Sequence, residues 1–185
     1  AFDSQNLGFW DAHAGTYREY HRAFRGVRDI MTGTSAGFLR WTDPEWLTAT
    51  HEWILEALDR EGLTLMGPIE QPHVRPWATV LRAPGSDGIV WCKAMVPAVA
   101  HEPVTISILA RAAPDRVPRL LASDLRRRLM LTADGGPRLR DLEAPRRSPN
   151  RWMAMLRTYA RLQRDVEHAA GELLGAGVPD RRPAA

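Results

Sequence analysis

Cysteine and lysine are nearly absent from the sequence. Its 185 residues include a single cysteine, Cys92, and a single lysine, Lys93. A single cysteine excludes an internal disulfide, which favours a reducing compartment and hence the cytoplasm. The apolar runs are too short to cross a bilayer, and no charged-then-apolar signal opens the chain, so no membrane partner is expected. No internal repeat is present, which excludes the repeat architectures.

The composition is that of a globular protein, with 44% hydrophobic and 25% charged residues. The length fits one ordinary domain, or a small lobe with part of another. The net charge is only +3, but residues 111–147 carry ten arginines against five acids. Such a stretch can bind phosphate or nucleic acid, yet its simplest interpretation is a solvated surface, so nucleic acid is not the expected partner.

The chain divides into three predicted parts. Residues 1–40 are expected to be an N-terminal extension, with poor periodicity apart from a short amphipathic helix around Trp10–Phe24. Residues 41–132 are expected to form the folded lobe. Residues 133–185 would hold a linker and the start of a helical lobe, whose apolar face lacks a visible partner and suggests a homo-oligomer or a missing segment.

An amphipathic helix is predicted to open the folded lobe and to end at Gly62. Thr42 with Glu45 fits a capping box, whereas Asp43 before Pro44 fits a cap with proline at the first position, and both starts remain open. The apolar stripe repeats every 3.6 residues and comprises Trp46, Ala49, Thr50, Trp53, Ala57 and Leu63, flanked by Leu47, Ile54 and Leu58.

After Gly62 the sequence consists of short runs with the composition or alternation of β-strands. One helix is predicted among them, at about Glu102–Ala112, with Pro103 in its first turn. A tight hairpin is expected at residues 85–88, and a linker at residues 134–137 precedes a long helix over Trp152–Leu174. The fold class is therefore α+β, a five-stranded antiparallel sheet with one packed helix. The predicted strands are Thr64–Glu70, Trp77–Ala83, Ile89–Met95, Val117–Ser123 and Arg128–Thr132.

Lys93 lies within an apolar strand, "IVWCKAM". Alternation places Trp91 and Lys93 on one face of this strand and Cys92 on the other. An ammonium on a half-buried surface needs an acid or an anion, because burying it unpaired costs free energy. The nearest acid in the following helix is Glu102. A strand lysine paired with a glutamate of the next helix is how kinases hold nucleotide phosphates.

The order of elements, with "RPWATVLRAPGSDGIVWCKAM", "AHEPVTISILARAAPDRVPRLLASD" and "LMLTADGGPRLRDL", resembles the amino-terminal lobe of the aminoglycoside phosphotransferase family. These are small-molecule kinases with a protein-kinase-like fold, and the resemblance covers about residues 41–176. It implies ATP or GTP with magnesium as the cofactor and a small hydroxylated acceptor as a further partner. Lys93 would contact phosphate and Glu102 would be its partner.

The same resemblance implies further nucleotide contacts. Thr132, Ala133 and Asp134 would form the hinge whose backbone meets an adenine edge. The loop Gln71–Pro76 would cover the phosphates. Because "QPHVRP" contains no glycine, its contacts would come from backbone N–H groups, Arg75 or His73.

Two departures from the family pattern are visible. Trp91 is bulky where protein kinases place a small residue against adenine. The family's His-Gly-Asp motif does not occur in this sequence. The catalytic residue and the magnesium ligands are therefore expected in a missing second lobe, and the chain by itself is not expected to transfer phosphate.

Simpler interpretations stand beside these predictions. Lys93 could extend from the sheet to solvent, and Glu102 could be an acid favoured by the helix dipole. The six histidines lack ligand spacing, so no metal site is expected. Two function classes remain: the nucleotide-binding lobe of a phosphotransferase, or a non-catalytic pseudokinase or basic interaction module using Arg126–Arg128 and Arg146–Arg147.

Overall fold

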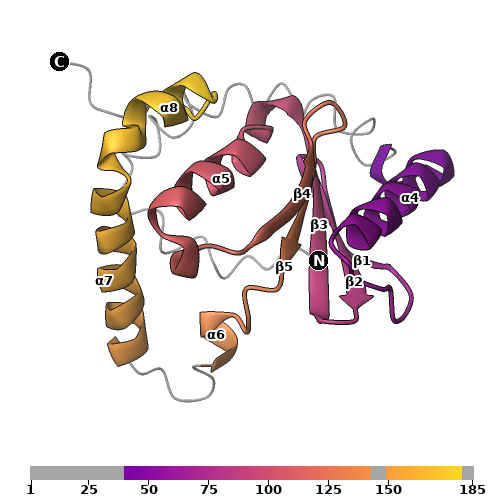
Figure 1. Ribbon diagram of the computed structural model, residues 1–185, viewed down its shortest axis with the longest axis horizontal. Helices are drawn as coiled ribbons and strands as arrows, with labels where there is room; N and C mark the ends of the chain where they lie inside the picture. Colours follow the sequence, from indigo (N-terminus) through magenta and orange to yellow (C-terminus); the bar gives the residue numbers. More distant parts are fainter. Residues whose placement is uncertain (1–39, 143–148, 181–185) are drawn as a thin grey trace, which may run out of the picture.

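The computed structural model describes residues 40–142 and 149–180, and within them the architecture is α+β (Figure 1). The predicted five-stranded antiparallel sheet is confirmed. The predicted extension at residues 1–40 and its short helix lie outside the described residues, apart from Arg40. The main elements are α4 (Pro44–Arg60), β1 (Glu70–Arg75), β2 (Ala78–Gly85), β3 (Gly88–Met95), α5 (Glu102–Ala112), β4 (Leu120–Asp124), β5 (Leu129–Ala133), α6 (Leu139–Leu142), α7 (Pro149–Asp165) and α8 (Ala170–Gly175).

The strand order is β1-β2-β3-β5-β4, so β3 lies at the centre of the sheet with β2 and β5 on its two sides. The predicted hairpin is confirmed, because Gly85 pairs with Gly88 across a two-residue turn, and Gly88 has φ +111°. A positive φ at that position favours glycine. The helix α5 is inserted between β3 and β4, and its predicted bounds are those observed.

Helix α4 begins at the second of the two predicted starts. Asp43 is the N-cap, its carboxylate accepts a hydrogen bond from the Trp46 N–H at 2.9 Å, and Pro44 is the first helical residue. Glu61 caps the other end and Gly62 follows with φ +69°. The local sequence therefore sets both ends of this helix.

One face of the sheet packs against α4 and the preceding Trp41, which form the main core. The alternation of the strands supplies one side of this core and the apolar stripe of α4 supplies the other. Figure 1 shows α4 lying against this face, opposite to α5. The buried cluster consists of Trp41, Trp53, Ile54, Ala57, Leu58, Leu81, Ala83, Val90, Cys92, Ala94, Leu129 and Leu131.

The first strand differs from the prediction. Within the predicted strand Thr64–Glu70, Leu65 makes an isolated bridge to Gly85, and the continuous strand is instead Glu70–Arg75. This strand occupies the segment predicted as the phosphate-covering loop, Gln71–Pro76. β1 is an edge strand with a register shift between Glu70 and His73, and both features accommodate Pro72. The connection to β2 is the short turn Pro76–Trp77.

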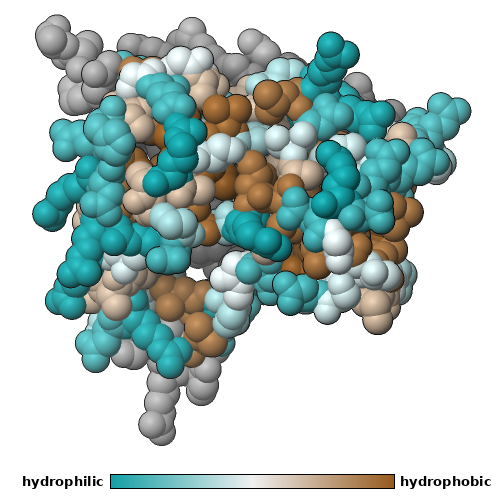
Figure 2. All heavy atoms as spheres, in the orientation of Figure 1, coloured by the Kyte–Doolittle hydropathy of each residue, from teal (hydrophilic) through white to brown (hydrophobic). Residues whose placement is uncertain are grey.

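The predicted long helix over Trp152–Leu174 is also wrong in its continuity. α7 ends at Asp165, a 3₁₀ turn follows at Glu167–Ala169, and α8 continues from Ala170. Val166 and Ala169 are buried at this break, whereas the first part of α7 is exposed. Figure 2 shows apolar surface between the lower parts of α7 and α6. The exposed large hydrophobic side chains of α6 and α7 are Leu142, Trp152, Met153, Met155, Leu156 and Tyr159.

The remaining strand boundaries differ by a few residues. β4 starts at Leu120 and not at Val117, and β5 ends at Ala133, one residue beyond the predicted end of the lobe. Within the described part of the chain, no helix is both long enough and apolar enough to cross a membrane.

Candidate functional site

Lys93 and Glu102 form an ion pair. The Lys93 Nζ lies 2.5 Å from the Glu102 Oε2, and both side chains are half-buried, with 29% and 30% of their surface exposed. The pair joins the central strand β3 to the first turn of α5. The predicted partnership of these two residues is thus present, and it links the sheet to the helix.

Two local features place Glu102 for this contact. It is the first residue of α5, and the positive end of the helix dipole favours a carboxylate there. Pro103 follows it, where its fixed φ is compatible with the helix and its missing N–H leaves no bond unmade. The carboxylate therefore faces β3 from a rigid position.

The face of the sheet that carries Lys93 also carries other basic residues. His73, Val80 and Lys93 occupy one row across β1, β2 and β3, and Arg75 lies two residues beyond His73 on the same face. His73 and Lys93 are two strands apart, which corresponds to about 10 Å between their backbones. His73 and Arg75 thus share a surface with Lys93, but they belong to a strand and not to a loop.

Arg82 was not singled out from the sequence, although it lies on this same face. It is the cross-strand partner of Trp91 and forms an ion pair with Glu70 at 3.3 Å. The signal was available, because Arg82 alternates with the buried residues Leu81 and Ala83 in an otherwise apolar strand.

The predicted hinge residues follow each other at the end of β5. Thr132 is buried and pairs with Trp91, Ala133 is the last residue of the strand, and Asp134 comes directly after it. The Ala133 N–H donates to the Arg119 carbonyl at 2.9 Å, and the Asp134 N–H donates to the Ile89 carbonyl at 3.1 Å.

A hydrogen bond that was not predicted from the sequence joins Trp91 of β3 to Asp134, the residue after β5. The Trp91 Nε1–H donates to the Asp134 Oδ1 at 3.0 Å. Trp91 shares its face with Lys93, so the indole extends over the end of β5 on the side of the ion pair. The bulky Trp91 was noted from the sequence, but its partner was not.

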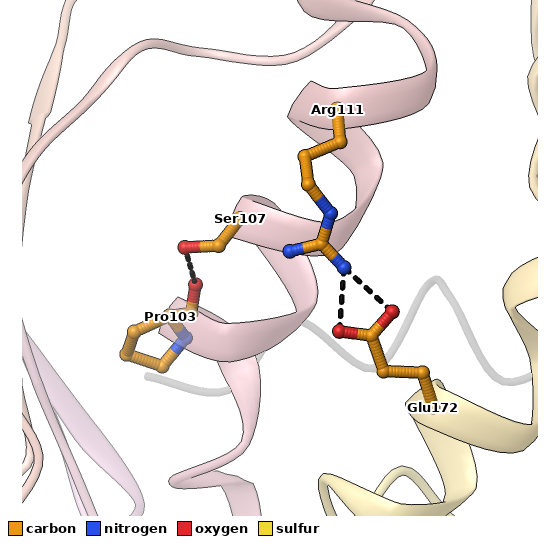
Figure 3. A network of polar contacts seen from close by, with 4 residues as sticks. All are labelled: Pro103, Ser107, Arg111 and Glu172. Atoms are coloured by element: carbon orange, nitrogen blue, oxygen red, sulfur yellow. Dashed lines mark hydrogen bonds and ion pairs between the residues drawn. The ribbon is translucent and has the colours of Figure 1, made fainter.

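The far side of α5 is held by charges from the C-terminal helices. Figure 3 shows Arg111 pointing from α5 toward Glu172 of α8, and one of its nitrogens lies 2.5 Å from both carboxylate oxygens. Arg116, just after α5, pairs with Asp165 at the end of α7. These contacts link the helix that carries Glu102 to α7 and α8.

Two hollows of the surface lie away from the Lys93–Glu102 pair. One, of about 570 Å³, is an open depression beside α4 and the β4–β5 turn, and Arg60, Arg126 and Arg127 are among its lining residues. The other, of about 340 Å³, lies between α5 and the C-terminal helices, where Arg111 and Glu172 line it. The chemistry predicted from the sequence therefore centres on the ion pair and not on these hollows.

Cys92 lies on the opposite face of β3 from Lys93 and is fully buried. Burial raises the pKa of its thiol from 9.0 to about 12. The thiolate is the reactive form of cysteine, and a raised pKa keeps Cys92 protonated at neutral pH. Cys92 is therefore an unreactive side chain of the core. Among the described residues, no three His, Cys, Asp or Glu side chains gather into a metal-binding group.

The stability of the protein is expected to fall as the pH rises from about 9 toward 12. In this window the unfolded chain loses the Cys92 proton while the folded chain keeps it, so the unfolded state binds fewer protons. The slope from this group is at most about 1.4 kcal/mol per pH unit. Urea unfolding at pH 8, 9 and 10 measures it, and Cys92→Ala should remove this part of the slope. Equal slopes in the two proteins would contradict the assignment.

No protein-family model matches the chain, and no curated protein matches it at a significant level of similarity.

Proposed function

We propose that this chain is the nucleotide-binding lobe of an ATP-dependent phosphotransferase that acts on a small molecule, similar to the aminoglycoside phosphotransferases. The observation that carries the proposal is the 2.5 Å contact between Lys93 Nζ and Glu102 Oε2. It places the only lysine of the chain between the central strand of an antiparallel sheet and the first turn of the next helix. Kinases fix a phosphate-binding lysine by a pair of the same kind, between a strand lysine and a glutamate of the following helix.

The ion pair leaves Lys93 able to bind an anion. An ammonium has three donors, and Glu102 accepts from one of them. Hydrogen bonds from an ammonium to phosphate oxygens are charge-assisted and therefore strong. His73 and Arg75 lie on the same face of the sheet, two strands away from Lys93, and add donors to that face. Glu102 holds the ammonium in place, and the phosphates of ATP or GTP would accept from its remaining donors.

The chemical step is assigned to residues outside this chain. The sequence contains no His-Gly-Asp motif. Phosphoryl transfer needs an acid that orients the acceptor hydroxyl, together with magnesium ligands. We infer that these groups and the acceptor site belong to a second lobe, so that this chain binds the nucleotide without transferring its phosphate.

Binding of magnesium-ATP by calorimetry tests this proposal. Lys93→Met should weaken binding by about 10- to 100-fold, because one charge-assisted contact to phosphate contributes roughly 1.5–3 kcal/mol. Arg127→Met, which removes an exposed charge at the β4–β5 turn, is the matched control and should bind as the parent protein does. Bound ATP should also slow the reaction of Lys93 with an amine-reactive ester. Lys93 is the only lysine of the sequence, so the label on a lysine side chain reports this site.

The proposal fails if Lys93→Met binds ATP as tightly as the parent protein. The alternative is a non-catalytic module that binds nucleic acid through arginines. The depression lined by Arg60, Arg126 and Arg127 favours it, although Glu56 and Asp124 also line this depression. Arg128 does not join this surface, because its Nε donates to the Met95 carbonyl at 3.3 Å, and Arg146–Arg147 lie outside the described residues. Absent ATP binding together with salt-dependent oligonucleotide binding would select this alternative.

A further inference from the structure

The position of Trp91 bears on how a nucleotide base could enter this site. Trp91 precedes Lys93 by two residues in β3 and therefore lies on the same face of the sheet. Its neighbours across the strands are Arg82 on β2 and Thr132 on β5. The indole reaches along β5 to Asp134, to which its Nε1–H donates at 3.0 Å. The indole is thus bonded to the first residue after β5, on the face of the sheet that carries Lys93.

Three polar groups at the end of β5 are already engaged. The N–H groups of Ala133 and Asp134 donate to the carbonyls of Arg119 and Ile89, and the Asp134 carboxylate accepts from Trp91. A purine that approached this edge would find these two peptide donors in use, and it would find the indole, a ring system of similar size, bonded to the neighbouring Asp134 carboxylate.

We propose that Trp91 is a gate on the base-binding part of the site, closed by its hydrogen bond to Asp134. This inference rests on the proposed function. A triphosphate can reach Lys93 while the gate is closed, but the base of a nucleotide can bind only after the indole has left Asp134. The apparent affinity for a nucleotide is then reduced by the fraction of molecules in which the gate is open.

Three variants, the parent protein and two ligands test the gate. Trp91→Val removes the ring and keeps a β-branched residue suited to a strand, and Asp134→Ala removes the acceptor and leaves the ring. Trp152→Ala, on the exposed part of α7, is the control for the loss of a tryptophan. The ligands are magnesium-ATP and inorganic tripolyphosphate, which has no base. Unfolding curves show that each variant is folded before its affinity is measured.

The expected result is that Trp91→Val binds ATP about tenfold more tightly than the parent protein, with a smaller gain for Asp134→Ala. The affinity of Trp91→Val and Asp134→Ala for tripolyphosphate should equal that of the parent protein. The affinity of Trp152→Ala for ATP should also be unchanged. If Trp91→Val binds ATP equally or less tightly while Lys93→Met still weakens it, the gate is wrong and the proposed function stands. If neither ATP nor tripolyphosphate binds any of the folded proteins, both the gate and the proposed function are wrong.

Discussion

Ile54→Ala is expected to lower the free energy of unfolding by about 2–5 kcal/mol, a large part of the stability of a typical domain. Ile54 is completely buried in α4, where it packs against the sheet as part of the main core. Removing three carbons leaves a cavity, and the gain in helix propensity from alanine offsets only a few tenths of a kcal/mol. Urea unfolding followed by circular dichroism measures the change.

The adjacent residue supplies the control. Leu55 has 45% of its surface exposed and lies on the other side of the same helix. Leu55→Ala deletes a side chain of equal size, yet it should change the free energy of unfolding by no more than about 0.5 kcal/mol. Comparable losses in the two variants would show that α4 does not pack through the face assigned to it.

The predictions of α4 and α5 succeeded because the residues that set the helix ends act locally. The start of α4 depends on Asp43 and Pro44, and that of α5 on Glu102 and Pro103, all of which act within one turn. Such capping signals and the periodicity between them are readable without knowledge of the tertiary structure. The turn between β2 and β3 was readable for the same reason, because glycines flank it.

The errors arose where tertiary contacts decide. The family resemblance implied a loop at Gln71–Pro76, but this segment is an edge strand whose register shift accommodates Pro72. The break after α7 has no glycine or proline at Val166. It coincides with the burial of that residue and with the ion pairs from Asp165 and Glu172 to α5 and the turn after it. Local propensity cannot report contacts of this kind.

The candidate site likewise contains one contact that was predictable from the sequence and one that was not. The pairing of Lys93 with Glu102 was predictable, because alternation fixes the face of the lysine and the helix start fixes the glutamate. The contact between Trp91 and Asp134 was not, since it depends on the register between β3 and β5. A one-residue change in that register would turn Trp91 to the other face relative to its partners.

Glu102→Ala is expected to cost about 1–3 kcal/mol of stability. The change leaves the half-buried ammonium of Lys93 without its partner, and breaking a fully buried pair costs about 3–5 kcal/mol, which the remaining exposure reduces. Glu172→Ala is the matched control, because its pair with Arg111 is more than half exposed and should contribute less than about 1 kcal/mol. The double variant Lys93→Met/Glu102→Leu should recover most of the loss, since no unpaired charge remains. If Glu102→Ala costs no more than Glu172→Ala in urea unfolding, the pair does not hold α5 against the sheet.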